Sequence, residues 1–63
     1  MYLLKVLEER KLSKLQLALN AKIIPSVLYL VLNGKQPFYP AWKKRISDYL
    51  QIDKKKLFDE GGN

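Results

Sequence analysis

Apolar residues recur at helical spacing in five separate segments of this 63-residue chain. The first segment covers residues 2–11. One stripe of the helix expected there carries Leu3, Val6, Leu7 and Arg10. Because apolar residues three and four positions apart share one face of a helix, the spacing predicts an amphipathic helix that buries this stripe.

A second helix is predicted over residues 13–21. Ser13 can accept a hydrogen bond from an unpaired N–H group of the first turn, which is the role of an N-cap residue. The side chains that this helix is expected to bury are Leu17, Ala18 and Ala21. Leu15 and Leu19 lie one turn apart on a face that an isolated domain exposes. This pair covers part of the small core, is tolerated at the surface, or binds a partner.

The third helix is predicted to run from Pro25 to Leu32. Residues 22–24 interrupt the apolar rhythm, and proline is well tolerated at the first helical position because the N–H it lacks has no partner there. Asn33 and Gly34 can end the helix, since both accept the left-handed conformation. The side chains expected to face inward are Leu28, Val31 and Leu32. Two short helices joined by a tight turn are therefore predicted.

Two further helices are predicted after a proline-containing loop. Pro40 suits the start of a fourth helix. Its apolar stripe is expected to be Trp42, Ile46, Tyr49 and Leu50. Asp53 can cap a last short helix. The side chains expected to close the core at its end are Leu57 and Phe58. We therefore predict a single domain over residues 1–59, followed by a flexible tail over residues 60–63.

Several apolar and turn residues fall in a distinctive order over residues 12–35. They are Leu12, Ser13, Leu17, Ala18, Ile23, Leu28, Val31, Asn33, Gly34 and Lys35. With a helix before them and an apolar pattern over residues 46–58 behind them, this order resembles the Cro/repressor-type (Xre-like) helix-turn-helix family of bacterial and phage transcriptional regulators. The resemblance implies an all-α fold, a compact five-helix lambda-repressor-like DNA-binding domain with a helix-turn-helix.

Five positions depart from the pattern of that family. Leu7 and Leu32 stand where relatives often carry an arginine and a glutamate that form a partly buried ion pair. Exchanging both partners for leucine is physically consistent, because packed apolar groups in place of a buried pair are often neutral or stabilising, so we expect Leu32 in the core. Lys22 replaces a frequent turn glycine, and Ile24 replaces the usual serine or threonine cap. Leu30 stands where many relatives carry a polar side chain that reads bases.

The resemblance implies that the third helix enters the major groove of double-stranded DNA while nearby residues hold the phosphates. The residues expected to contact DNA are Lys14, Pro25, Ser26, Val27, Tyr29, Leu30, Asn33, Lys35, Phe38 and Lys43. Ser26 can bond a base edge or a phosphate, and Tyr29 can reach a phosphate. Val27 and Leu30 can pack against thymine methyl groups. Because the third helix carries no Arg, Asn or Gln, specificity is expected from methyl contacts, water and DNA shape.

Composition favours a polyanionic partner and argues against catalysis. The net charge is +6 and the pI is about 9.7. Residues 35–56 carry seven positive charges and two negative ones. The chain has no cysteine and no histidine, so it lacks thiolate ligands, imidazole ligands and the commonest physiological acid or base. We therefore expect no metal, no cofactor and no enzymatic activity.

No apolar run approaches the ~20 residues that a bilayer requires, and the apolar segment near the N-terminus is too short for a signal peptide. We expect a soluble protein in the cytoplasm of a bacterial cell or a phage-infected host, with no membrane partner. In a homodimer, the two third helices would need to lie about 34 Å apart to reach successive major grooves. Relatives dimerise through their C-terminal helices, which points here to Tyr49 and Ile52. The face of Leu15 and Leu19 is the competing surface.

The apolar character of the third helix is also consistent with a second function on the same scaffold. A protein-interaction module, such as an antirepressor or corepressor, would bind a larger regulatory protein through an apolar face. The residues expected to form that face are Leu15, Leu19, Tyr29 and Leu30. The fold does not separate these two functions, because function resides in the site that a fold carries.

Overall fold

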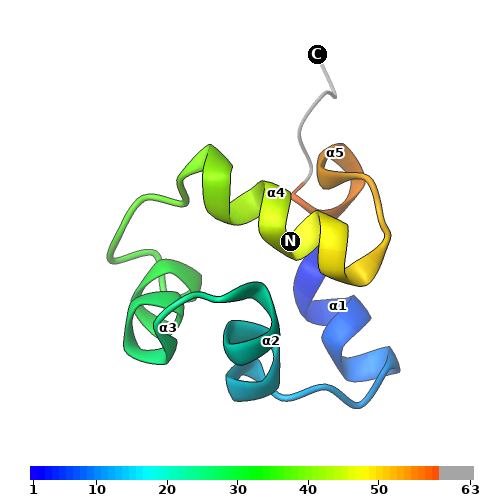
Figure 1. Ribbon diagram of the computed structural model, residues 1–63, viewed down its shortest axis with the longest axis horizontal. Coiled ribbons are helices and arrows are strands. Elements are labelled where there is room, and N and C mark those ends of the chain that lie inside the picture. Colours follow the sequence, from blue (N-terminus) through cyan, green and yellow to red (C-terminus); the bar gives the residue numbers. More distant parts are fainter. Residues whose placement is uncertain (59–63) are drawn as a thin grey trace.

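Five helices and no strand make up the part of the chain that the computed structural model describes, residues 1–58 (Figure 1). In chain order the helices are α1 (Tyr2–Glu9), α2 (Lys14–Ala21), α3 (Pro25–Leu32), α4 (Pro40–Leu50) and α5 (Lys54–Leu57). The predicted all-α class and the predicted order of helices are confirmed. The end of the predicted domain at residue 59 and the predicted tail over residues 60–63 lie outside the described residues.

Helix α1 is shorter than the sequence pattern predicts. It ends at Glu9, because Lys11 takes a left-handed conformation with φ of 57°, which does not continue a right-handed helix. The predicted core residues Leu3, Val6 and Leu7 are all buried. Arg10 is exposed at the end of the helix, so its assignment to the buried stripe was wrong.

Helix α2 begins with the cap that the sequence predicts. The hydroxyl oxygen of Ser13 accepts a hydrogen bond from the N–H of Gln16 at 3.0 Å. The side-chain oxygen of Gln16 accepts in return from the N–H of Ser13 at 2.9 Å, which completes a capping box. The predicted inward residues Leu17, Ala18 and Ala21 are all buried. These two reciprocal hydrogen bonds between Ser13 and Gln16 fix the first turn of α2.

Residues 22–24 join α2 to α3, and the helix axis turns by 120° between them. Lys22 takes a left-handed conformation with φ of 59°, and the N–H of Ile23 donates to the carbonyl of Ala18 at 2.9 Å. Helix α3 then begins at Pro25, while Ile24 makes no side-chain bond to cap it. The predicted pair of short helices with a tight turn between them is confirmed.

Helix α3 packs mainly against α2. Leu28 and Val31 are buried as predicted, and Leu32 is half-buried, packed against the edge of the core rather than within it. Of the two residues able to end the helix in the left-handed conformation, only Gly34 does so, with φ of 75°. Asn33 keeps a right-handed φ of −87°.

The buried side of α4 is centred on Ile46 and Leu50. Trp42 is half-buried, but Tyr49 is 38% exposed, so placing Tyr49 in the apolar stripe was wrong. At the end of α4 the hydroxyl of Ser47 donates to the carbonyl of Ile52. The edge of α4 that carries Tyr49 is open.

Helix α5 closes the core as predicted. A carboxylate oxygen of Asp53 accepts from the N–H of Lys55 at 2.9 Å and caps the helix. Leu57 is fully buried, and Phe58 is half-buried. The ring of Phe58 packs edge-on against Phe38 with centroids 4.8 Å apart, which ties the end of α5 to the connector between α3 and α4.

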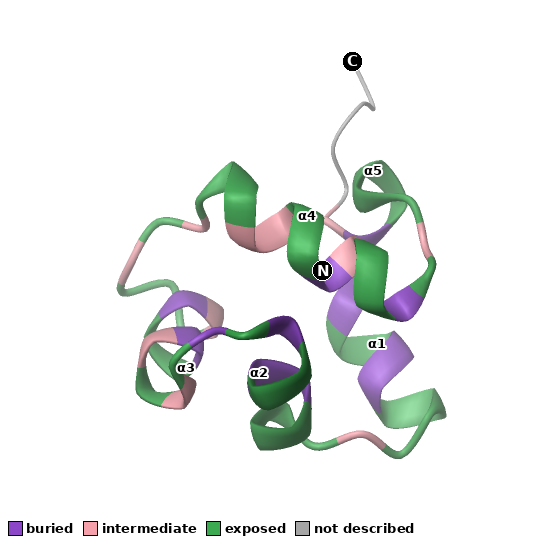
Figure 2. Cartoon of the chain, in the orientation of Figure 1, coloured by how far each residue is buried: buried purple, intermediate pink, exposed green. Residues whose placement is uncertain are grey.

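Every helix contributes at least one fully buried side chain to a single core. These side chains are Leu3, Leu17, Leu28, Ile46, Leu50 and Leu57. Figure 2 shows the buried positions on the sides of the helices that turn toward one another, with exposed positions on the outer sides of α2 and α3. Among the described residues, no polar or charged side chain is buried. The core is therefore wholly apolar.

Within residues 1–58, no single helix is long and apolar enough to cross a membrane. Helices α2 and α3 meet the requirements of length and composition only when they are counted together, across the 120° turn between them.

Replacing Lys22 by glycine should raise the free energy of unfolding by about 0.5–1 kcal/mol, because glycine takes the left-handed conformation without the steric cost that a Cβ brings. The measurement is a urea denaturation curve. Lys22→Ala is the matched control, since it removes the same charge and side chain but keeps the Cβ. Equal stability of the glycine and alanine variants would contradict this account of the turn.

Candidate nucleic-acid interface

One face of α3 is uncovered along its whole length. Ser26, Tyr29, Leu30 and Asn33 follow the spacing that aligns residues on one side of a helix, and all of them are exposed. Tyr29 is 40% exposed and Leu30 is 42% exposed, whereas Leu28 on the opposite side is fully buried. We call Ser26, Tyr29, Leu30 and Asn33 the outer face of α3. Nothing in the described residues lies over it.

The outer face of α3 has unusual chemistry for a surface. No charged residue occurs between Lys22 and Lys35, so the whole helix is neutral. Its polar groups are the hydroxyls of Ser26 and Tyr29 and the side-chain amide of Asn33. The remaining surface is the hydrocarbon of Leu30 and the ring of Tyr29. This face can form single hydrogen bonds and apolar contacts, but it has no positive charge of its own.

Positive charges flank this neutral helix along the chain. Residues 10–47 include no Asp and no Glu. They include eight basic residues, namely Arg10, Lys11, Lys14, Lys22, Lys35, Lys43, Lys44 and Arg45. The acidic residues of the chain lie before and after this stretch, and among the described residues Asp48 is paired with Lys44 at 3.2 Å. The stretch that contains α2, α3, their connectors and the first half of α4 therefore carries a net positive charge, which attracts anions.

The two lysines expected to hold phosphates lie at separate ends of the α2 and α3 pair. Lys14 is the first residue of α2, and Lys35 follows the end of α3. Both side chains are exposed. Both ammonium groups are therefore accessible. One precedes the neutral helix α3 along the chain, and the other follows it.

Phe38 and Lys43 lie in an aromatic cluster with Phe58 rather than on the outer face of α3. The ammonium nitrogen of Lys43 is 6.0 Å from the ring centroid of Phe38 and 5.5 Å from that of Phe58. Phe38 and Lys43 are both half-buried. This cluster fixes the connector after α3, and DNA contact by these two residues stays a prediction.

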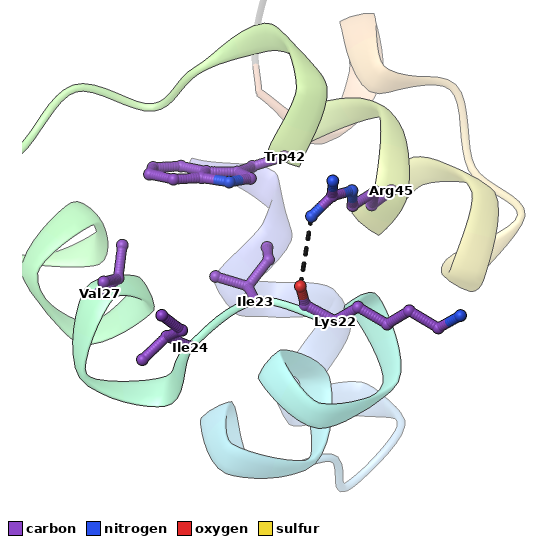
Figure 3. A pocket seen from close by; sticks show the side chains of 6 residues that line it. All are labelled: Lys22, Ile23, Ile24, Val27, Trp42 and Arg45. Carbon is purple, nitrogen blue, oxygen red and sulfur yellow. Dashed lines mark hydrogen bonds between the residues drawn. The ribbon is translucent and has the colours of Figure 1, made fainter.

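Val27 also lies away from the outer face. It lines a cavity of about 180 Å³ between the α2–α3 turn and α4. Figure 3 shows the indole of Trp42 on one side of this cavity and Ile23, Ile24 and Val27 on the other. Pro25 and Val27 are half-buried, and neither belongs to the outer face of α3. A base contact by either residue stays a prediction.

Arg45 joins α4 to the turn before α3. One guanidinium N–H of Arg45 donates to the carbonyl of Lys22 at 3.2 Å, as Figure 3 shows. Lys22 is the left-handed residue of the turn, so this bond holds the turn in the conformation that aims α3. Sequence reasoning missed this role, because the bond joins residues 23 positions apart and Arg45 sits in an ordinary basic run.

Leu15 and Leu19 are exposed on α2, at 46% and 62% of their surface. They do not cover the core, which removes the first of the three interpretations of this pair. A tolerated surface position and a partner contact remain. Ile24, at 66%, and Leu30 are further exposed apolar side chains on α3 and the turn before it. Other large apolar side chains are exposed elsewhere among the described residues, namely Met1, Leu4, Tyr39 and Tyr49.

The described residues include no group of three His, Cys, Asp or Glu side chains that could hold a metal ion. Comparison of the chain with models of protein families, with curated proteins and with solved structures finds no match. The function is therefore argued from the chain's own residues: an uncovered neutral face on α3 and a surrounding surface that carries positive charge.

Two leucines of α3 test whether the outer face is uncovered. Leu28→Ala should lower the free energy of unfolding by about 2–5 kcal/mol, because it leaves a cavity in the core. Leu30→Ala should change it by no more than about 0.5 kcal/mol, because Leu30 lies at the surface. Both values come from urea denaturation followed by circular dichroism. Comparable losses in the two variants would show that Leu30 is covered.

Proposed function

We propose that this protein is a small DNA-binding transcriptional regulator of the Cro/repressor type and not an enzyme. In this function α2 and α3 act as a helix-turn-helix, and the outer face of α3 enters the major groove. The observation that carries the proposal is the exposure of that face within a stretch of chain, residues 10–47, that has positive charges and no negative ones.

The geometry of α2 and α3 supports this proposal. Each helix has eight residues, three residues connect them, and the axis turns by 120°. A helix-turn-helix pairs two helices at about 90–120° across a connection of three to four residues. A helix with its side chains is about 10–12 Å across, and the major groove is about 12 Å wide, so α3 can enter the groove along its exposed side.

The charge distribution suggests that residues outside α3 provide the attraction to DNA, while α3 provides the contacts with the bases. Because α3 itself is neutral, attraction to the phosphates has to come from its surroundings, with Lys14 and Lys35 the first residues to test. Phosphate contacts of this kind fix the position and orientation of a protein on DNA without reading sequence. The bond from Arg45 to the Lys22 carbonyl would then keep α3 at a fixed angle to that phosphate grip.

A homodimer of this regulator would use the open edge of α4. Tyr49 is 38% exposed there, and Ile52 is half-buried nearby in the chain. Two copies joined through this edge would need to present their α3 helices about 34 Å apart to read successive major grooves. The face of Leu15 and Leu19 is the competing surface for self-association.

The proposal predicts a strong dependence of DNA binding on salt. The logarithm of the association constant for labelled duplex DNA should fall linearly with the logarithm of salt concentration, and Lys14→Ala or Lys35→Ala should each reduce the slope by about 0.9 if each lysine holds one phosphate. Fluorescence anisotropy at several salt concentrations gives the slopes.

The control variant for this titration is Lys5→Ala, since Lys5 lies on α1, at the other end of the molecule from α3 in Figure 1. This variant should keep the slope of the unaltered protein. Absence of binding at low salt, or equal slopes in all four proteins, would count against the proposal.

A second function is favoured by one specific observation, the exposure of Leu15 and Leu19 on a single face of α2. A protein-interaction module, acting as an antirepressor or corepressor, would bind a larger regulator through these leucines together with Tyr29 and Leu30. In such a module the apolar outer face of α3 is a docking surface for protein rather than for bases.

Leu15→Gln combined with Leu19→Gln separates the two functions, because it removes the apolar surface without changing the charge. Both side chains are exposed, so the double variant should keep its thermal unfolding midpoint within a few degrees. It should also keep most of its DNA affinity if the protein is a DNA-binding regulator. Loss of a regulator captured by the unaltered protein in a pull-down, with DNA binding absent in both proteins, would favour the interaction module instead.

A further inference from the structure

We propose that α3 selects its DNA site through thymine methyl groups, so that its preferred substrate is a duplex whose major groove exposes thymine methyls to the outer face. This inference rests on the proposed function and adds to it the class of site that is read.

The apolar part of the outer face is large and accessible. Leu30 is 42% exposed, and Tyr29, its neighbour on the same face, is 40% exposed. Residues near the start of a recognition helix commonly lie deepest in the groove. A helix that enters the groove with these side chains presents hydrocarbon to the bases.

The polar part of the outer face is too small to read bases in the usual way. Pairs of hydrogen bonds to guanine or adenine come from Arg, Lys, Asn or Gln side chains. Helix α3 has none of these, and Asn33 lies beyond its last residue, at the end away from the first turn. Ser26 supplies one hydroxyl in the first turn. Direct reading of guanine is therefore excluded for most of the face.

The base pairs differ in the groups that they present to an apolar side chain in the major groove. A thymine presents a methyl group in the major groove, and burying it against Leu30 removes apolar surface from water. A G·C pair has no methyl group there, only the small C5–H of cytosine beside its donors and acceptors, and leucine packed over the polar groups would leave them without partners. Each buried methyl corresponds to about a three- to fourfold gain in affinity. The outer face therefore favours thymine and disfavours G·C pairs.

The experiment compares duplexes of equal length with alternating A and T, alternating A and deoxyuridine, and alternating G and C. Deoxyuridine keeps every hydrogen-bonding group of thymine and lacks only the methyl. We expect the A–T duplex to bind about tenfold more tightly than the A–deoxyuridine duplex, as two methyl contacts would give, with the same salt slope for both. The G–C duplex should bind most weakly.

Leu30→Ala assigns the effect to α3. It should lower the affinity ratio of the A–T and A–deoxyuridine duplexes by at least the three- to fourfold of about one methyl contact, while leaving affinity for the A–deoxyuridine duplex nearly unchanged. Leu19→Ala is the matched control, because it removes the same atoms from an exposed leucine of α2 and should keep the ratio. An unchanged ratio in Leu30→Ala would mean that Leu30 does not read the methyl group, and would overturn the inference.

The remaining outcomes separate this inference from the proposed function. Equal affinity for the A–T and A–deoxyuridine duplexes, with the expected salt slope, overturns methyl recognition and leaves DNA binding standing. No binding to any of the three duplexes at low salt overturns both.

Discussion

The packing of α3 against α2 is the interaction on which the rest of this structure depends. Leu28 and Val31 of α3 are buried on the side that meets α2, and α2 offers two alanines, Ala18 and Ala21, on its own buried side. Small side chains let two helices approach closely, so one side of α3 is enough to anchor it. The other side is then free to contact a ligand.

A short chain imposes this arrangement. Small domains bury a modest fraction of their surface, and each of the five helices here gives at least one fully buried side chain to the same core. Apolar residues that do not reach the core stay exposed, and Leu15, Leu19 and Leu30 are such residues. They lie on α2 and α3, within the stretch of chain, residues 10–47, that carries basic residues and no acidic ones.

The helices and their starts could be predicted from the sequence because local rules decide them. Ser13, Pro25, Pro40 and Asp53 each stand at or next to a helix start, as their side chains or ring geometry dictate. Predictions failed where distant segments decide. Tyr49 is exposed although it shares the helical spacing of Ile46 and Leu50, and periodicity contains no information about how far around α4 the other helices reach.

The same limit explains what sequence reasoning missed at the candidate site. Gln16 was not recognised as the second half of a capping box, although its spacing from Ser13 is a local signal. Arg45 had no local signal, since its acceptor is a backbone carbonyl in another part of the chain. The outer face of α3, in contrast, follows from helical periodicity once Leu28 and Val31 are known to be buried.

Trp42 gives this protein an internal optical probe. It is the only tryptophan in the chain, and its indole forms one wall of the cavity between α4 and the turn that leads into α3. Its emission responds to the polarity of that narrow space, so a shift of α3 relative to α4 would alter the spectrum. A ligand that shifts α3 relative to α4 can therefore be followed in the unlabelled protein, in real time, by its own fluorescence.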